Sequence, residues 1–570
     1  MKNCYKFSIS VLILFFLINL TFISCGKSSN FKSPATGWNV NDKKGGFYFN
    51  TNYKKQTIAP GMVLIEGGTF TKGKIQDDVL NEQTNGVSRQ HVQSFYMDET
   101  EVTNLMYLEY LYWIKKVFPP ESEKYSKIYF GVVPDTLVWR NRLGFNEAMT
   151  ENYLRHPAYA DYPVVGVNWI QANEFASWRT NRLNENILEN KRFTAKDTKM
   201  NHVDSETTFD TETYFASPTS VYGGKQELTM GGVISQLMLK RKKVKDLYVQ
   251  RYDGFLSPEY RLPTESEWEY AATAEIEKRE FNNIKGQKKY PWSGKYTRNN
   301  KRKVKGDQLA NFKQSKGDYG GIAGWSDDGA DITNMVRAYE PNSFGLYDMA
   351  GNVAEWVADI YRPITDDEVS DFNYFRGNVF KKNKLNTEGK FEISTAETLE
   401  YDTLRNGKII ARNLPGQIVR ERVNEDDTFL RTNYDKSYNI NYRDGDQQST
   451  RFFKKASVDG DKIDPKEIMY NAPIHGVKTD SLGKMLKKVD SSNKRSTLVN
   501  DEVRIYKGGS WQDRAYWLDP AQRRYLSQEL ATDFIGFRCA MSSVDPKSDN
   551  KKTKSGYNII RYRPKTKKEY

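Results

Sequence analysis

Long polar stretches divide this chain of 570 residues and constrain its fold more than any other feature of the sequence. The longest covers about 362–502 and is rich in Asn, Asp, Lys and Tyr, and others cover about 187–250 and about 275–305. Only 38% of the residues are hydrophobic and the mean hydropathy is −0.76, yet 13% are aromatic. We therefore predict well-packed segments joined by irregular loops with a few short strands.

The first residues have the pattern of a secretory signal. Two lysines precede an apolar run from Phe7 to Ile23, and the run stops at Cys25. The junction resembles a bacterial lipobox, in which the cysteine thiol is lipidated and becomes the mature N-terminus. An uncleaved membrane helix is the alternative, but about 17 apolar residues interrupted by polar ones are short for a bilayer of roughly 30 Å. We predict a signal peptide over 1–24, lipidation of Cys25, and a polar tether over 25–58.

Short blocks between the polar stretches have the spacing of regular elements. Met62–Ile65 predicts a strand that meets a tight glycine turn, and Glu101–Asn104 opens an aromatic-rich helix that continues to about Phe118. Pro163–Trp169 predicts a short buried strand that runs into a helix, and Asn168 is placed to cap that helix.

The clearest local signal is a helix start within Arg261–Trp268. Thr264 is placed to accept a hydrogen bond from the amide of Glu267, while the Glu267 carboxylate accepts one in return. We therefore predict a capping box, followed by a helix that turns Trp268 and Ala271 toward the core.

Cysteine and histidine are too scarce for most metal or redox chemistry. Cys4 lies in the signal and Cys25 is the predicted lipid site, so only Cys539 remains, and we expect it to be a buried small hydrophobic residue. No disulfide can then form within the mature chain. The four histidines are scattered without ligand spacing, which argues against a zinc or iron site.

The chain is basic, with a formal net charge of +13. Much of the excess lies in Lys240–Lys243, in 285–305 and in the tail after Pro546. An exported chain meets no nucleic acid in bulk, so we expect anionic envelope surfaces or acidic partners and no nucleic-acid partner. A solvated charged face is the alternative explanation.

Seven segments, taken in order, resemble the formylglycine-generating enzyme (sulfatase-modifying factor) family. They are Gly67–Phe70, Glu101–Asn104, Pro163–Trp178, Arg261–Ala272, Pro341–Trp356, Gly508–Trp511 and Gly536–Ala540. The resemblance implies an α+β fold, namely the family's variant of the C-type-lectin architecture with little regular secondary structure. It would span 59–545, with long insertions at about 187–250 and 362–502 and a basic tail over 546–570.

The resemblance also allows the family's chemistry to be tested on this chain. The active enzymes carry two cysteines, at the third and eighth positions after the serine of the Gly-Gly-Ser segment, which bind copper and activate oxygen. Those positions here hold Asp513 and Leu518. A carboxylate is a hard, weak ligand for Cu(I) and leucine has no donor, so we expect no copper and no enzyme activity. The clustered histidines of iron-dependent relatives have no counterpart either.

Two structural calcium sites are implied by the same resemblance. One would use Asn311, Phe312, Asp328 and Ala330, and the other Asp348, Gly351, Val353 and Glu355. Side-chain oxygens mixed with backbone carbonyls are what a hard cation with six to eight oxygen ligands requires. The alternative is that Asn311 and Asp328 merely cap loops.

Within the family, the lipobox, the missing cysteines, the long insertion and the basic tail resemble the gliding-motility lipoproteins of Bacteroidota. That resemblance implies a non-catalytic outer-membrane lipoprotein that faces the periplasm and serves gliding motility and type IX secretion. Its partners would be other envelope proteins of these machineries, including the ring lipoprotein. The sister lipoprotein that builds the type IX secretion ring is the near alternative.

Two hypotheses from other classes stay open. An enzyme with different chemistry would use a charged groove, and a glycan- or peptidoglycan-binding lectin-like module would stack aromatic rings on sugars. The groove residues would be Asp513, Arg514, Arg523 and Arg524, and the stacking residues Trp511, Tyr516 and Trp517.

Overall fold

The computed structural model describes residues 31–40, 46, 47, 49, 56–73, 85–140, 146–191, 193, 194, 208–224, 248–275, 288–314, 329–362, 381–423, 477–479, 485–487, 499 and 502–544. The predicted signal peptide, Cys25 and the tail over 546–570 lie outside these residues. Among the helices within the described ranges, none combines the length and the apolar character that a membrane crossing needs.

The chain divides into two compact units, of which the smaller contains Met1–Lys55 and Val249–Phe255. In this unit β1 (Phe31–Lys32) pairs antiparallel with β2 (Asn39–Val40), and a short 3-10 helix, η4, covers Arg251–Asp253.

The larger unit contains two four-stranded sheets. The first has the order β3-β6-β18-β7 and is antiparallel throughout. The second has the order β16-β15-β8-β17, in which only the β17–β8 pair is parallel. Their strands are β3 (Met62–Ile65), β6 (Phe95–Asp98), β7 (Tyr260–Arg261), β8 (Ala354–Ile360), β15 (Val503–Lys507), β16 (Arg524–Ser527), β17 (Ile535–Gly536) and β18 (Ala540–Ser542). Segments from opposite ends of the sequence therefore complete the first sheet.

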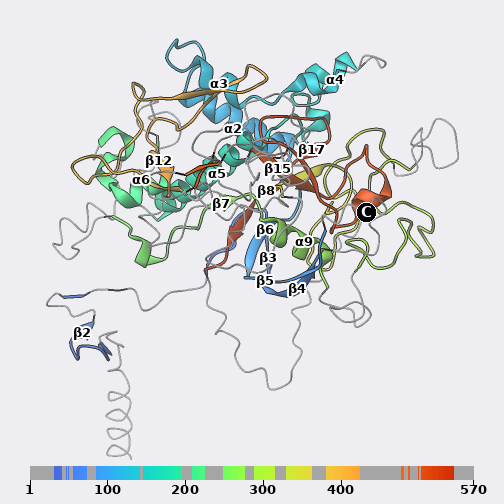
Figure 1. Ribbon diagram of the computed structural model, residues 1–570, viewed down its shortest axis with the longest axis horizontal. Helices are drawn as coiled ribbons and strands as arrows, with labels where there is room; N and C mark the ends of the chain where they lie inside the picture. Colours follow the sequence, from blue (N-terminus) through green and yellow to red (C-terminus); the bar gives the residue numbers. More distant parts are fainter. Residues whose placement is uncertain are drawn as a thin grey trace, which may run out of the picture. The chain divides into compact units, whose positions relative to one another are not determined.

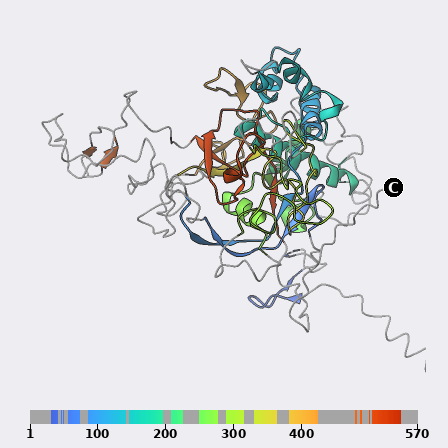
Figure 2. The same ribbon diagram turned by 90° about the vertical axis from the view of Figure 1, so that its right-hand side faces the viewer.

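Helices and a ribbon surround the sheets. The α-helices are α2 (Asn104–Val117), α3 (Ser126–Val132), α4 (Glu147–Asn152), α5 (Trp169–Asn190), α6 (Thr211–Ala216) and α9 (Glu265–Thr273), and the 3-10 helices of this unit are η1 (Thr136–Trp139), η2 (Pro157–Tyr159), η3 (Pro218–Gly224) and η9 (Ala515–Leu518). The ribbon pairs β4 (Gly68–Lys72) with β5 (Ser88–Val92). Figures 1 and 2 show α2 and α3 at one end of this unit, and the ribbon with α9 at the other. This mixture of helices and strands confirms the expected α+β class.

The helix starts follow the predicted capping chemistry. Asn168 accepts a hydrogen bond from Gln171 N at 2.9 Å and the Gln171 side chain accepts one in return, which starts α5. Thr264 and Glu267 form the predicted capping box of α9, and Trp268 is fully buried behind it. These predictions are confirmed because a cap depends only on residues close in sequence.

The predicted strand in Pro163–Trp169 is wrong, although the segment is buried. Only Pro163 forms an isolated bridge, and Gly166 has a left-handed φ of +74°. The backbone bonds three separate partners: Val164 N donates to the carbonyl of Val102 at 2.9 Å, Gly166 N donates to that of Thr532 at 2.8 Å, and the Gly166 carbonyl accepts from Asp135 N at 2.7 Å. The run of apolar residues correctly predicted that this segment is buried. It did not show whether the backbone forms a β-strand.

The structure describes parts of both long polar insertions. Helix α5 continues to Asn190, a few residues past the expected start of the first insertion at 187. In the second, β9 (Lys381–Asn383) pairs with β12 (Arg420–Arg422), β10 (Tyr401–Thr403) pairs with β11 (Ile409–Ala411), and β13 (Val477–Thr479) pairs with β14 (Met485–Lys487). Short strands among irregular loops are what the sequence predicted.

The second insertion packs against the helical end of the unit. A Cβ added at Gly131 of α3 would lie 2.6 Å from the carbonyl oxygen of Ile409, so helix and insertion touch through their backbones. Lys408 Nζ donates to the carbonyl of Val133, just after the end of α3. The described part over 381–423 is therefore docked on the core.

Candidate functional site

Asp513, which the sequence resemblance assigned to the position of the first catalytic cysteine, forms an ion pair with Arg524. Arg524 Nη1 donates to Asp513 Oδ1 at 2.6 Å and Nη2 donates to Oδ2, so the pair is bidentate. Ser510 Oγ donates to Oδ2 at 2.6 Å. The guanidinium lies 4.7 Å from the ring centroids of both Tyr506 and Trp517. This carboxylate is held by N–H and O–H donors, and its oxygens are hard ligands that do not favour a soft metal ion.

Leu518, which the sequence resemblance assigned to the position of the second cysteine, belongs to the hydrophobic core. Leu518 ends η9 and has no exposed surface. It packs in a small cluster with Tyr290, Ala310, Phe312 and Ala350. An ion pair and a packed leucine therefore lie at the two positions where the sequence resemblance would place thiols.

The aromatic residues considered for sugar stacking are used within the protein. Trp511 stacks on Trp139 with ring centroids 6.1 Å apart, and its Nε1 donates to the carbonyl of Asp533 at 3.1 Å. Trp517 carries the Arg524 guanidinium over its ring and contacts Tyr516 edge-on. These contacts favour a packing role for the three rings over sugar binding.

A second cluster of predicted site residues surrounds Arg538. Arg538 Nε donates to Glu355 Oε2 and Nη2 donates to Oε1, each at 2.7 Å, and neither side chain is more than 1% exposed. Trp268 Nε1 also donates to Glu355 Oε2, at 2.8 Å. The Glu355 carboxylate is therefore held by three donors, which leaves little of its capacity of about four acceptor sites.

Two further buried carboxyl groups lie close to this pair. Burial raises the pKa of Asp348 to about 6, although the Arg337 N–H, which donates to its Oδ2 at 3.0 Å, and Arg538 lower it. Burial raises the pKa of Glu101 well above its ordinary value, and Asp348 and Glu355 raise it further. Three acids thus share one region whose nearest buried cation is Arg538.

Asn311 of one predicted calcium site lies next to Gly351 of the other. Gly351 has φ of +78°, and an added Cβ would lie 2.3 Å from the carbonyl oxygen of Asn311. The same carbonyl accepts a hydrogen bond from Asn352 N at 2.8 Å. The Asn311 side chain donates to the carbonyl of Ile332 at 2.7 Å. Glycine is required at position 351 because the backbone must turn this close to its neighbour.

The remaining predicted ligands have mixed outcomes. Asp328 lies outside the described residues, whereas Ala330 is described. Val353 packs beside Trp139 and donates its N–H to Glu101 Oε1 at 3.2 Å. Across the described ranges, no three or more His, Cys, Asp or Glu side chains are arranged as a ready metal site. Calcium binding at either site stays a prediction.

Sequence reasoning missed three residues of this region. Glu101, Asn352 and Arg538 are all buried, and Asn352 Nδ2 donates to Glu101 Oε2 at 2.9 Å. Asn352 has φ of +60°, in the left-handed region that asparagine tolerates better than most residues. The Gly-Asn pair in the sequence was the signal for that turn. Nothing local marked Glu101 as buried, because its partners lie far away in the chain.

The last thiol has the role that the sequence predicted. Cys539 is fully buried, and burial raises the pKa of its thiol well above the ordinary range. Its backbone N–H donates to Asp98 Oδ2 at 2.9 Å. A buried, protonated thiol is a packing residue.

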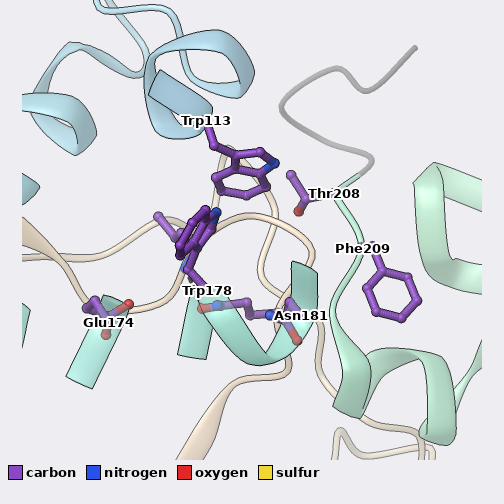
Figure 3. A pocket seen from close by; sticks show the side chains of 8 residues that line it. Trp113, Glu174, Trp178, Asn181, Thr208 and Phe209 are labelled. Atoms are coloured by element: carbon purple, nitrogen blue, oxygen red, sulfur yellow. Dashed lines mark hydrogen bonds between the residues drawn. The ribbon is translucent and has the colours of Figure 1, made fainter. Parts of the chain in front are cut away.

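A separate recess lies where both insertions meet the core. It is lined by Trp113 of α2, by Glu174 and Trp178 of α5, by Phe209 and by Leu414. Figure 3 shows the two indoles beside each other, with Phe209 on the far side of the recess. Trp178 Nε1 is buried and has no hydrogen-bond partner among the described residues. The recess is small and its indole rings are almost fully buried, so their faces are closed to a stacked ligand.

Comparison with known proteins identifies the family to which this chain belongs. Residues 49–403 match the family described as "Sulfatase-modifying factor enzyme 1-like domain". The chain belongs to this family. Mouse (Mus musculus) formylglycine-generating enzyme is 25% identical over 321 residues, which are 54% of this chain and 63% of that protein. Mouse "Inactive C-alpha-formylglycine-generating enzyme 2" is 38% identical over 108 residues, or 19% of this chain and 28% of that protein.

The chain thus spans less than two thirds of the length of either mouse relative. The name of the second relative indicates that the sulfatase-modifying factor family includes members without activity. Among solved structures, PvdO from Pseudomonas aeruginosa is 15% identical and has a TM-score of 0.35, with 86% of this chain and 99% of that chain covered.

Proposed function

We propose that this chain is a non-catalytic outer-membrane lipoprotein of the GldJ group, which acts as a structural and interaction component of the gliding motility and type IX secretion machinery. Its fold would be the family's C-type-lectin variant, anchored through Cys25 and facing the periplasm. The lipobox pattern, the family membership and the docked part of the long insertion over 381–423 support this proposal.

The proposal that the protein is non-catalytic rests on one observation: Asp513 and Leu518 are held in packed environments at the two positions where the resemblance would place the catalytic cysteines. The Asp513–Arg524 ion pair and the buried Leu518 leave no thiolate at either position. Oxidation of a substrate cysteine by the family's route needs soft ligands for copper, and neither side chain is one.

A direct assay tests this part. Purified protein is incubated with Cu(I), oxygen and a cysteine-containing peptide beside an active formylglycine-generating enzyme. We expect no formylglycine product, no oxygen consumption and no stoichiometric copper. Tight copper uptake together with oxygen consumption would contradict the proposal.

The long insertion is the proposed docking surface. Loops carried on a rigid scaffold are common binding sites, and this insertion links two neighbouring strands. Tyr361 N donates to the carbonyl of Val503 at 2.9 Å, so the two ends of the insertion are adjacent. Residues 363–501 can therefore be replaced by a short hairpin turn that leaves β8 and β15 paired.

The shortened chain separates docking from folding. We expect it to be exported and to melt cooperatively, at a lower temperature because Ala411 and Leu414 leave the core, but to lose gliding, type IX secretion and co-purification of envelope partners. Arg405→Ala is the matched control, since it removes only exposed ion pairs between the insertion and Glu502 and Glu529. Survival of all three functions in the shortened chain would remove the docking role.

Cross-linking of the native envelope tests which lipoprotein this is. We expect cross-links to other gliding and secretion proteins, including the ring lipoprotein. Assembly of this chain itself into the ring would instead favour the sister lipoprotein. Labelling with a radioactive fatty acid, lost in Cys25→Ala, tests the anchor.

We also infer a structural calcium ion near Asp348 and Glu355. The buried acids Glu101, Asp348 and Glu355 outnumber Arg538, so their charge suits a divalent cation with oxygen ligands. Such an ion would compensate buried charge and hold the turn at Gly351. It would supply no redox chemistry.

A further inference from the structure

The smaller unit exposes large aromatic side chains to an unusual degree. Trp38 is 80% exposed, Phe47 is 68% exposed and Phe49 is 45% exposed. The rings of Phe47 and Phe49 stack with centroids 6.3 Å apart, so they form one apolar surface. Single exposed apolar residues are common on proteins, but aromatic residues grouped within a dozen positions mark an interaction site.

Trp38 is presented by a hydrogen-bonded turn. Ser33 N donates to the carbonyl of Trp38 at 2.8 Å, and Gly37 N donates to that of Ser33 at 2.8 Å. Gly37 has φ of +73°, which glycine adopts without strain. The β1–β2 pairing, with Lys32 opposite Asn39, closes the hairpin behind the turn. The indole therefore projects from a defined turn.

The sequence that carries these rings is strongly basic. Residues 26–55 contain one acidic residue, Asp42, against several lysines, which are Lys27, Lys32, Lys43, Lys44, Lys54 and Lys55. Aromatic rings combined with lysines are the pattern that binds the headgroup region of an anionic bilayer, because the rings enter the interface while the ammonium groups meet phosphates. A protein partner of the same chemistry would have to be both apolar and acidic.

We propose that the β1–β2 hairpin together with Phe47 and Phe49 docks on an anionic phospholipid surface, with Trp38, Phe47 and Phe49 in the headgroup layer. The segment begins six residues after Cys25, so a lipid anchor at that cysteine would keep it within reach of the bilayer. The docked segment would hold this part of the chain on the membrane, in contrast to the free polar tether predicted from composition. The inference goes beyond the proposed function and does not need lipidation.

Vesicle co-sedimentation tests the proposal on a chain that starts at Gly26 and so keeps every described residue. We expect binding to phosphatidylcholine vesicles that contain phosphatidylglycerol, weakened at least about tenfold on phosphatidylcholine alone and weakened further by salt. The variant Trp38→Ser/Phe47→Ser/Phe49→Ser should bind at least about tenfold more weakly than the wild type. Since these side chains are exposed, its melting temperature should not change.

The matched control is Tyr112→Ser/Tyr296→Ser, which removes two rings of the larger unit that are 61% and 81% exposed. It should bind vesicles as the wild type does. Equal binding of the triple variant and the wild type would overturn the proposal, as would equal binding to both lipid mixtures. Self-association without lipid that depends on Trp38 would identify a second copy as the occupant instead. If Cys25 carries no fatty acid, the result would contradict the proposed lipoprotein function but not the proposed membrane docking.

Discussion

Two buried charge clusters in the larger unit differ in how they are neutralised. The first lies beside α9, where Lys72, Lys507 and Arg523 pair with Glu265 and Glu269. Asp359 at its edge accepts a hydrogen bond from Glu265 N, and burial raises the pKa of this one carboxyl group. Lys507 Nζ lies 2.9 Å from Glu269 Oε2, and Arg523 Nε lies 2.6 Å from Glu265 Oε1. Burial raises the pKa of Glu265, but Arg523, Lys72 and Lys507 outweigh it and hold the pKa well below the ordinary range.

The second cluster lacks that balance. Glu101, Asp348 and Glu355 share the single buried guanidinium of Arg538, which is committed to Glu355 through two hydrogen bonds. The pKa of Glu101 and that of Asp348 are accordingly raised, because burial is not offset. In the cluster beside α9 the protein's own cations neutralise the buried acids, whereas the cluster around Arg538 has more acids than cations. Since a buried unpaired charge is costly, the second cluster is where an external cation would stabilise the protein.

The largest expected effect comes from unbalancing the first cluster. Lys507→Met removes the ammonium between Glu269 and Glu265 while keeping the length of the side chain. Two buried carboxylates then lose a partner, which should lower the free energy of unfolding by about 3–5 kcal/mol. Urea unfolding followed by circular dichroism measures the change.

An exposed ion pair provides the control for that measurement. Lys390 and Glu388 are 77% and 67% exposed, so Lys390→Met should cost less than about 1 kcal/mol. Equal losses of unfolding free energy in Lys507→Met and Lys390→Met would show that burial does not set the strength of these ion pairs. The contrast between the two buried clusters would then have no energetic meaning.

Calcium should have the next largest effect, and only through the second cluster. Bound at one hundred times its dissociation constant, the ion would add about 2.7 kcal/mol to the free energy of unfolding. We expect calcium to raise the melting temperature by several degrees and EDTA to lower it. A scan with no shift under either condition would count against both predicted sites.

Asp348→Asn localises the effect. The amide oxygen can still accept from Arg337 N, so the fold keeps that hydrogen bond while one negative charge is lost. Without calcium the variant should be as stable as the wild type or more stable, and its response to calcium should be much weaker. A full calcium response in this variant would place the ion elsewhere.

The sequence predicted those parts of the fold that depend on neighbours in the chain. The capping boxes at Asn168 and Thr264 and the strand at Met62–Ile65 were found because their signals lie within a few residues. Pro163–Trp169 was assigned wrongly because hydrophobic residues report burial and not backbone direction. The pairing of β18 with β6 and β7 joins segments hundreds of positions apart, which no local pattern encodes.

The candidate site divides in the same way. The family motifs indicated Asp348, Gly351 and Glu355, and the structure brings them to one region. The motifs did not reveal that Arg538 would hold Glu355, or that Glu101 would add a third acid. The balance of charge depends on which side chains meet in the folded protein. It could not be predicted from the sequence, because the residues of this cluster come from distant segments of the chain.

The smallest expected effect concerns a single carboxyl group that belongs to neither cluster. Burial raises the pKa of Glu174 to about 7, although Lys381 and Arg420 lower it, and the group forms no ion pair among the described residues. The folded state therefore keeps a proton between pH 4.5 and 7 that the unfolded state has already lost. Stability should fall as the pH rises through this interval. The full pKa shift corresponds to about 3 kcal/mol, and solvent screening of this partly exposed side chain reduces the expected fall to about 1–2 kcal/mol.

Glu174→Gln removes this dependence, because an amide does not titrate. The variant should match the wild type near pH 4.5 and exceed its stability above pH 7, which melting curves across that range would measure. If the two proteins keep a constant difference at every pH, then Lys381 and Arg420 already neutralise Glu174 in the folded state. The carboxyl would then resemble the balanced cluster beside α9, and excess buried acid would be confined to the region around Arg538.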